Sequence, residues 1–492
     1  MTCVERSANT SEYVAVHAAM EPARPAVVVG EETLGYGLVY EHIKNFTVGL
    51  HALGIAEGDR CIVKIAHPYV HWLILLALEN LAAVSCSMQP QEGNSDPRLL
   101  GCANKLISQH TEETGGLVQS VCLPLEWVQT QLNTSTDDAC YREVLRFLAP
   151  HAGQRIKRTS GTTGGMKIML SSNQGEEAII KSFAEVMGFT RDTRYLLVNS
   201  FVISSVYLAA TLCLRLGALV IFERGESRLE LIARHRVTHV RFFQQQLLDI
   251  LKDIEQNTLP KPAKLTVILG AAPVSRALWD RVQGMLATTI VYAYNANECG
   301  SICIMGPDGV GAVRAGVQVS IVGPDDQVLA PGQTGRVRVK VPHMVTSYID
   351  NPLADRQNFK HGWFYTGDAG QMIGPRLLKL LGRVDDVLIF AGFKRTADDY
   401  EVNVCVVEAV REACALAAQD ALGVDRLVLC LVATPGSDQS ALVQTIARLF
   451  PAFITEGGRV FFVDSLPRTA NGKLQRAAMK ARLPQLTGAY ML

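Results

Sequence analysis

The sequence carries no excess of charge and no cysteine spacing typical of a metal site. Its 492 residues include 47 Lys and Arg and 47 Asp and Glu, so the formal net charge is zero. Because a basic excess is lacking, we expect no nucleic-acid partner. The closest of the cysteines, Cys299 and Cys303, are too far apart in sequence for a C-x-x-C pair, and no histidine cluster accompanies them. The composition therefore gives no indication of a structural zinc centre.

Targeting segments and long apolar runs are lacking as well. The first residues, MTCVERSANTSEYVAV, show no basic stretch followed by an apolar run, so no signal peptide is predicted. We therefore expect a cytoplasmic protein with reduced thiols. The apolar stretches 71–86 and 207–222 are shorter than a membrane span and contain Glu79 and Arg215. No membrane span is expected, and both stretches are interpreted as buried helices or strands.

Strand-like and helix-like segments alternate through the first 300 or so residues, a pattern that favours an α/β fold with parallel sheet. Strands are predicted over 25–30, 60–66, 216–224, 237–243, 264–273 and 289–295, with helical segments between several of them. From about residue 311 short strands separated by Gly, Pro and Asp turns indicate a β-rich subdomain that extends to about 381. Residues 382–492 form a smaller α+β segment, with a helix predicted over 398–413 and strands over 426–434 and 458–464.

Residues 159–167 read TSGTTGGMK. Glycines let backbone N–H groups approach an anion, and hydroxyls and a lysine add donors and charge, so the stretch is suited to phosphate. It is not a Walker A motif, because Lys167 follows Met166 and precedes Ile168. Taken alone, the stretch is more typical of a solvated surface turn.

Four further stretches occur with it in a fixed order. They are YAYNANE (292–298), GWFYTGD (362–368), LGRVDDVLIFAGFK (381–394) and LPRTANGKLQR (466–476). Together the five stretches resemble the signatures of the adenylate-forming superfamily of acyl-CoA and aryl-CoA synthetases, luciferases and peptide-synthetase adenylation domains. The resemblance covers roughly residues 20 to 480. It implies a large N-terminal AMP-binding domain over 1–381 and a small mobile C-terminal domain over 382–492.

The resemblance also implies a two-step reaction. A carboxylic acid attacks the α-phosphate of ATP with the help of Mg²⁺, which gives an acyl-adenylate, and a thiol usually then takes the acyl group. The phosphates would be held by the loop residues Thr159, Ser160, Gly161, Thr162, Thr163, Gly164 and Lys167. Glu298 would bind the metal, since Mg²⁺ prefers hard oxygen ligands. Arg158 would either add charge near the phosphates or pair with an acid.

Other residues would hold the nucleoside and move between the two steps. Tyr294 would stack on adenine, Asn297 would contact phosphate, and Asn295 replaces a Gly that would suit a positive φ. The adenine wall would be Gly270, Ala271, Ala272 and Pro273. Asp368 and Arg383 would bind the ribose. Lys473 would be the adenylating lysine, and Asp385 the hinge about which the small domain rotates.

The acid itself is predicted less closely. The family position that carries an Asp in amino-acid-activating members is Val202 here, so substrates without an α-ammonium are expected. Val202, Ile203, Ser204, Phe243 and Ser301 are the predicted acid-binding residues. They favour an apolar acyl or aryl acid with a polar substituent.

Two acceptors for the acyl group remain open, coenzyme A and the phosphopantetheine of a carrier protein. No carrier-like segment follows residue 480, so a carrier would be a separate partner, as for stand-alone family members that serve a biosynthetic assembly line. Two alternatives also stand: transfer of the adenylate to an amine to give an amide, and a non-catalytic binding relative.

Overall fold

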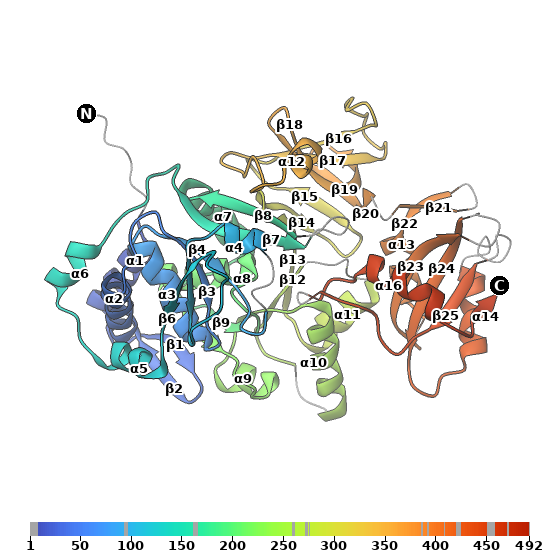
Figure 1. Ribbon diagram of the computed structural model, residues 1–492. Helices are drawn as coiled ribbons and strands as arrows, with labels where there is room; N and C mark the ends of the chain where they lie inside the picture. The colour runs from blue at the N-terminus through green and yellow to red at the C-terminus, as the bar shows by residue number, and fades with distance from the viewer. Residues whose placement is uncertain are drawn as a thin grey trace.

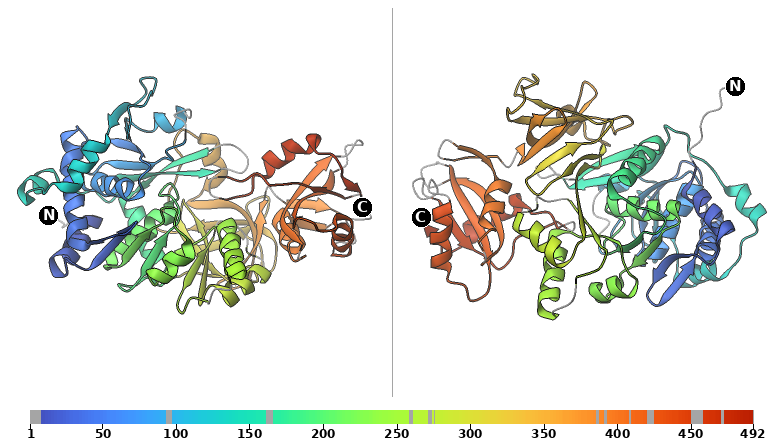
Figure 2. Two further views of the ribbon diagram at one scale, coloured as in Figure 1. Left: turned by 90° about the horizontal axis from the view of Figure 1, so that it is seen from below. Right: turned by 180° about the vertical axis from the view of Figure 1, so that it is seen from behind.

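The computed structural model describes residues 8–92, 97–160, 166–257, 261–270, 274, 276–384, 387–390, 393–407, 409–419, 425–449, 458–469 and 472–491. The larger part is α/β, and its chain runs from blue to orange in Figure 1. The C-terminal strands and helices, in orange-red and red, form a smaller unit beside it in all three views (Figures 1 and 2). These two parts agree with the fold class predicted from sequence.

A 14-stranded sheet is the main scaffold of the larger part. Its parallel strands lie in the order β1 (Pro25–Val29), β10 (Leu219–Phe222), β9 (Arg194–Leu197), β11 (His239–Arg241), β12 (Thr266–Leu269) and β13 (Thr289–Ala296). Antiparallel β2 (Glu32–Gly35) borders β1. Beyond β13 the sheet continues antiparallel through β14 (Gly300–Met305), β15 (Val310–Val313), β20 (Leu377–Arg383), β19 (Trp363–Gly374), β17 (Gly335–Lys340) and β16 (Gln318–Val322), with β18 (Phe359–Lys360) against β19. The β-rich region predicted near 311–381 therefore belongs to this same sheet, and β20 crosses the predicted domain boundary at 381.

A second sheet of six strands ends in the hairpin that carries the predicted phosphate loop. Its order is β6 (Gln119–Cys122), β5 (Lys105–Ser108), β3 (Arg60–Lys64), β4 (Val84–Ser87), β7 (Gly153–Ser160) and β8 (Met166–Ser172). Strands β7 and β8 pair antiparallel, with Thr159 opposite Lys167. The described ends of this hairpin, Ser160 and Met166, are paired with each other, and the predicted loop residues between them lie outside the described residues.

Apolar faces of four helices pack between the two sheets, and the other helices of the larger part lie around them. The helices of the larger part are α1 (Thr10–Met20), α2 (Tyr36–Ala52), α3 (Pro68–Asn80), α4 (Pro97–Gly101), α5 (Leu125–Asn133), α6 (Asp138–Val144), α7 (Asn173–Met187), α8 (Ser204–Leu216), α9 (Arg228–Arg234), α10 (Gln244–Asn257), α11 (Arg276–Met285) and α12 (Pro352–Asn358). Every residue of α3 after Pro68 is buried, including the polar His71, Glu79 and Asn80, as expected for a helix that is mostly apolar on all sides. One hydrophobic cluster joins α2, α3, α7 and α8 to strands of both sheets.

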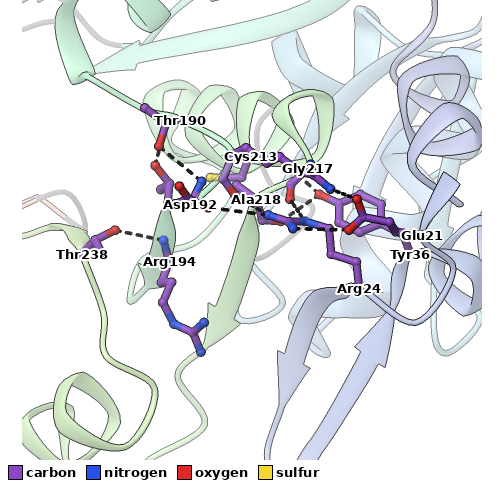
Figure 3. Close-up of polar contacts among 12 residues, drawn as sticks. Glu21, Arg24, Tyr36, Thr190, Asp192, Arg194, Cys213, Gly217, Ala218 and Thr238 are labelled. Carbon is purple, nitrogen blue, oxygen red and sulfur yellow. Dashed lines mark hydrogen bonds and ion pairs between the residues drawn. The ribbon is translucent and has the colours of Figure 1, made fainter.

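Polar contacts attach the N-terminal segment to the turn between α8 and β10 (Figure 3). Gly217 ends α8 with a φ of 76°, a left-handed conformation that glycine adopts readily. The Arg24 Nε donates to the Gly217 carbonyl at 2.7 Å, and the Tyr36 hydroxyl donates to the Ala218 carbonyl at 2.8 Å. These contacts hold residues about 190 positions apart in sequence, and they help to fix β1 beside β10.

The described residues of the C-terminal part form a separate four-stranded sheet, a hairpin and three helices. The sheet order is β23 (Val410–Gln419), β24 (Asp425–Ala433), β25 (Arg459–Phe462) and β26 (Tyr490–Met491), and the hairpin is β21 (Val387–Phe390) with β22 (Phe393–Thr396). Its helices are α13 (Ala397–Val404), α14 (Gln439–Leu449) and α16 (Arg476–Arg482), followed by the 3-10 turn η2 (Leu483–Gln485). Here one prediction was wrong. The helix expected over 398–413 ends at Val404, and residues from Val410 form β23.

Candidate active site

The turn between β13 and β14 presents the predicted metal ligand. A register irregularity between Tyr294 and Asn295 bends β13 just before the turn. Glu298 follows in the turn and is buried, and its Oε1 accepts a hydrogen bond of 2.7 Å from the Tyr348 hydroxyl. Desolvation raises the pKa of Glu298, although the Tyr348 hydrogen bond and the charges of Lys167 and Lys157 act in the opposite direction. A buried carboxylate with cations nearby is a credible ligand for a bound metal.

Lys167 lies near Glu298, because both residues contact Tyr348. It projects from β8, where its Nζ donates to Asn358 Oδ1 at 3.0 Å and lies 5.2 Å from the centre of the Tyr348 ring. Tyr348 therefore contacts both the Lys167 ammonium of β8 and the Glu298 carboxylate of the β13–β14 turn. Thr159 lies opposite Lys167 in the hairpin. Strand pairing thus brings two of the predicted phosphate-binding residues to the edge that faces Glu298.

Asp368 and Arg383 are direct neighbours on adjacent strands. They face each other across β19 and β20, and the Arg383 Nη1 donates to Asp368 Oδ1 at 3.2 Å and to the Thr366 carbonyl at 2.7 Å. The Tyr294 hydroxyl donates to Asp368 Oδ2. Each carboxylate oxygen keeps a further lone pair, so Asp368 can still accept from a diol.

Gly367 is required at its position because of this pair. Its φ is +79°, and a Cβ there would lie 2.5 Å from the Arg383 Nη2. A side chain would be strained and would displace the guanidinium from Asp368.

The predicted adenylating lysine reaches the same place from the C-terminal part. The segment before α16 extends toward α10 (Figure 1), and a Cβ at Gly472 would lie 3.5 Å from the Phe243 Cβ. The neighbouring Lys473 is exposed to solvent, yet protein groups surround it closely enough for desolvation to be the largest effect on its pKa. Desolvation and the charge of Arg383 lower this pKa, whereas Asp368 and Glu298 act to raise it. Lys473 is therefore electrostatically coupled to the predicted ribose and metal residues.

Two asparagines lie close to Glu298, Asn295 at the end of β13 and Asn297 in the turn that follows, and they differ in their hydrogen bonds. The Asn297 Nδ2 donates to the Arg158 carbonyl at 3.4 Å, which ties the turn to β7. Asn295 lies within β13 and does not have the positive φ that its place in the sequence suggested. Its Oδ1 is buried without a hydrogen-bond partner in the described structure. This acceptor is thus available for a donor such as an amino group on a bound ligand.

The sequence left two roles open for Arg158, a charge near the phosphates or a partner for an acidic residue. Its Nη1 forms an ion pair of 2.6 Å with Glu92, and its Nη2 donates to the Ser87 carbonyl at 3.2 Å. The structure therefore gives Arg158 an acidic partner on the neighbouring segment.

The predicted acid-binding residues lie in three segments: the start of α8, the residues after β11, and β14. Val202 and Ile203 are half-buried in the segment that leads from β9 into α8, and Ser204 is the buried first residue of α8. Phe243 is buried beside Gly472, as described above. Ser301 is buried in β14, and its carbonyl accepts from the Arg314 Nη1 at 3.0 Å. The roles of all five in binding the acid stay predictions.

Several predicted site residues lie outside the described residues: Gly161, Thr162, Thr163, Gly164, Ala271, Ala272, Pro273 and Asp385. Ser160 and Gly270, at the margins of these gaps, end β7 and follow β12.

Sequence reasoning missed two residues that the structure brings to the site. Tyr348 contacts both Glu298 and Lys167, but it lies in a loop segment, TSYID, that carries no motif. Arg241 ends β11 with its side chain buried. The signal for Arg241 was visible as a cation inside an otherwise apolar predicted strand, VTHVRFF.

Comparison with known proteins agrees with this geometry. The AMP-binding enzyme family matches residues 146–349, and the AMP-binding enzyme C-terminal domain matches residues 399–473. The fold and the site thus define an AMP-binding enzyme with both of its usual parts. The chain belongs to the adenylate-forming superfamily.

Individual relatives are distant but cover nearly the whole chain. The 4-coumarate–CoA ligase 3 of Oryza sativa subsp. japonica is 22% identical, over 98% of this chain and 93% of its own. The o-succinylbenzoate coenzyme A synthetase (MenE) of Bacillus subtilis, solved with ATP and magnesium, superimposes with a TM-score of 0.81 at 21% identity, over 95% of this chain and 99% of its own. The amide bond synthetase McbA of Marinactinospora thermotolerans gives a TM-score of 0.80 at 18% identity, over 96% and 98%. At such identities the solved structures show a shared fold.

No described helix is long and apolar enough to cross a membrane. The cysteines that the structure describes are all free. Within the described residues there is also no group of three or more His, Cys, Asp and Glu that could hold a metal ion.

Proposed function

We propose that this protein uses ATP and Mg²⁺ to convert a carboxylic acid into an acyl-adenylate and then transfers the acyl group to the thiol of coenzyme A or of a carrier-bound phosphopantetheine. The observation that carries the proposal is the position of Lys473. It lies within electrostatic reach of Asp368, Arg383 and Glu298, although it comes from the C-terminal part of the chain. A cation at the meeting point of a ribose site and a metal site suits the adenylation step.

The residues present fit a nucleotide and a magnesium ion. The unpartnered Oδ1 of Asn295 can accept from the amino group of adenine, and Asp368 can accept from the ribose hydroxyls. Glu298 supplies the hard oxygen ligand. Since no larger cluster of acidic residues is found in the described parts, the ion would depend on substrate phosphates as well, as Mg²⁺ commonly does. When bound, the ion would spread the negative charge of the phosphates.

The chemistry of the chain's own residues follows from their charges. In the first step a carboxylate oxygen of the acid attacks the α-phosphorus of ATP, and the bond to pyrophosphate breaks with its electron pair. Both reactants are anions, so Lys473 and Lys167 would lower the barrier by holding positive charge where negative charge gathers. In the second step the thiol sulfur attacks the acyl carbon, the thiol proton is released, and AMP departs.

The test is pyrophosphate exchange into ATP over a panel of aryl, short-chain and medium-chain acids beside the twenty amino acids. We expect exchange with at least one acid that lacks an α-ammonium, because Val202 provides no anion to pair with an ammonium. Lys473→Ala should lower this exchange by roughly 100-fold or more. Lys480→Ala, an exposed lysine of α16, is the matched control and should retain full activity. Strong exchange with an α-amino acid alone, or equal exchange by both lysine variants, would contradict the proposal.

The acceptor is identified by product analysis. The purified protein, its acid and ATP are incubated with coenzyme A, with phosphopantetheine on a carrier protein, or with simple amines. We expect a thioester product. An amide formed in preference to either thioester would favour the alternative of an amide synthetase.

A further inference from the structure

Arg241 is a buried cation that has no acidic partner among the residues that the structure describes. The residue ends β11 and is 5% exposed. In the described structure its Nε and Nη1 are buried with no hydrogen-bond partner. Desolvation lowers the pKa of its guanidinium, and the only opposing influence comes from the phenol of Tyr195. An unpaired buried charge is costly to keep, so a compensating role for this arginine is expected.

Other buried arginines of the same domain are compensated. Arg215 forms ion pairs with Glu79 at 3.6 Å and Glu177 at 2.7 Å. The Arg155 guanidinium donates to the Ser85 and Ser87 hydroxyls and to the Phe201 carbonyl, and it lies 3.9 Å from the centre of the Tyr207 ring. The fold therefore pairs or bonds its buried cations elsewhere, and the condition of Arg241 is specific to its position.

That position is the edge of the sheet where ligands are expected. Strands β9, β11, β12 and β13 are parallel neighbours, so their carboxyl ends meet at one edge, where α/β proteins usually bind ligands. The Arg241 Nη2 lies 2.9 Å from the point where a Cβ would stand on Gly270. Gly270 directly follows β12 at this edge, so the absence of a side chain there leaves room for the guanidinium.

Neighbouring contacts connect Arg241 to the acid-binding segments. The Asn199 Nδ2, just after β9, donates to the Arg241 carbonyl at 3.1 Å, and the Gln246 Nε2 donates to Asn199 Oδ1 at 2.9 Å. Gln246 in turn accepts from the Phe243 N–H at 2.9 Å. Phe243 is the residue against which Gly472 packs. The Arg241 backbone is thus linked to the segment after β9, its guanidinium adjoins Gly270, and Gly472 packs two residues further along the chain, at Phe243.

We propose that Arg241 binds a second anionic group on the acid substrate, so that the protein selects dicarboxylic acids over neutral monocarboxylic acids. The proposal rests on the proposed function and names the substrate class of the same site. A planar guanidinium matches a carboxylate in a two-point hydrogen bond. The residues predicted for phosphate, Thr159 and Lys167, lie on the β7–β8 hairpin of the other sheet. The free carboxylate of the acid, rather than ATP, is therefore the anion assigned to Arg241.

The experiment compares matched acids in pyrophosphate exchange. Succinic, glutaric, adipic and phthalic acids are each paired with their monomethyl esters, which retain one reactive carboxylate and remove the second charge. The wild-type protein should prefer at least one diacid over its ester by roughly 100-fold in kcat/KM, the scale of a charged pair broken on one side. Arg241→Met should remove this preference by raising KM for the diacid far more than KM for the ester.

Two controls accompany the variant. Arg194→Met removes a different arginine at the opposite, amino end of β9, where its Nε donates to the His235 carbonyl, and it should keep the diacid preference. Thermal unfolding gives a readout independent of turnover. Diacid without ATP should raise the unfolding midpoint of the wild-type protein and not that of Arg241→Met. If Arg241→Met does not fold, Arg241→Gln serves in its place.

Each outcome is informative. Equal turnover of diacids and esters by the wild-type protein would overturn the inference and leave the proposed function intact. Equal losses for both acids in Arg241→Met would assign the guanidinium to ATP and also overturn it. If no acid of any class supports exchange, the proposed function itself fails, and the inference fails with it.

Discussion

Glu298 and Tyr348 form a pair whose chemistry makes the site sensitive to pH. The carboxylate form of Glu298 is needed to bind a cation, and desolvation raises its pKa while the Tyr348 hydroxyl lowers it. Since the pKa is raised, the carboxylate is lost at a higher pH than for an ordinary glutamate as the solution is acidified. The acid side of the activity profile is therefore expected to reflect this residue.

We predict that Tyr348→Phe moves the acid limb of the kcat/KM profile to higher pH, because the phenylalanine no longer donates to the carboxylate. Glu298→Gln should lower activity by roughly 100-fold and remove the limb, since an amide does not titrate in this range. The measurement is pyrophosphate exchange between about pH 5 and 9 with Mg·ATP as the varied, limiting substrate, so that kcat/KM for Mg·ATP reports the free enzyme. An acid limb that stays fixed or moves to lower pH in Tyr348→Phe would contradict the assignment.

Some residues of the site could be predicted from the sequence, and others could not. Glu298, Asp368, Arg383 and Lys473 were predicted together, and the structure places them within reach of one another because strand pairing and the loop before α16 bring the motifs together. Tyr348 could not be predicted, since its partners lie 50 and more positions away and only tertiary packing joins them. The φ of Asn295 depends on the bulge in β13, which a pattern of residue types does not reveal.

Among the elements, β7 is anchored to α7 by a buried ion pair. The Lys157 ammonium contacts the Glu176 carboxylate, and both side chains are almost completely inaccessible, at 1% and 2%. Strand β7 leads into the predicted phosphate loop, and the charge of Lys157 also acts on Glu298. The Lys157–Glu176 ion pair therefore both anchors the β7–β8 hairpin to α7 and places a positive charge that lowers the pKa of Glu298.

Removing one partner of this pair should be far more damaging than replacing both. We predict that Glu176→Ala lowers the free energy of unfolding by about 3–5 kcal/mol, because Lys157 would be left buried and unpaired. The double variant Lys157→Met/Glu176→Leu should recover most of the loss. Denaturant unfolding of the three proteins checks this. Additive losses in the double variant would show that the two residues act independently.

The C-terminal elements illustrate the limit of predicting secondary structure from apolar spacing. The segment DDYEVNVCVVEAVREA has helical periodicity throughout, but α13 occupies only its first half. From Val410 the chain pairs with β24 over its whole length and buries Ala413 and Ala415 in the sheet. Tertiary pairing therefore overrode local propensity, as it often does for residues that both helix and strand accept. The strands predicted over 25–30, 60–66 and 289–295 had no such competition and match β1, β3 and β13.

At the scale of the whole molecule, Lys473 of the C-terminal part is electrostatically coupled to Arg383, Asp368 and Glu298 of the larger part, the arrangement that we expect for the first reaction step. A second arrangement for thiol transfer, reached by rotation at Asp385, stays a prediction from the family resemblance. Lys473→Ala should abolish adenylate formation but still convert a pre-made acyl-adenylate to thioester. Asp385→Pro should do the opposite, because proline fixes φ and resists rotation. The two half-reactions are assayed separately, and equal loss of both in both variants would exclude the two-arrangement scheme.

Strand β20 has a consequence for the order in which products leave. Arg383 of β20 pairs with Asp368 of β19 and lies only two residues before the predicted hinge at 385. In the proposed scheme the ribose-binding pair would stay with the large sheet, and Lys473 would move with the C-terminal part. Rotation can then proceed with the nucleotide still bound. We expect pyrophosphate to leave before the thiol enters and AMP to leave last. AMP would then inhibit competitively against ATP, and pyrophosphate would not. Competitive inhibition by pyrophosphate against ATP would contradict this sequence of release.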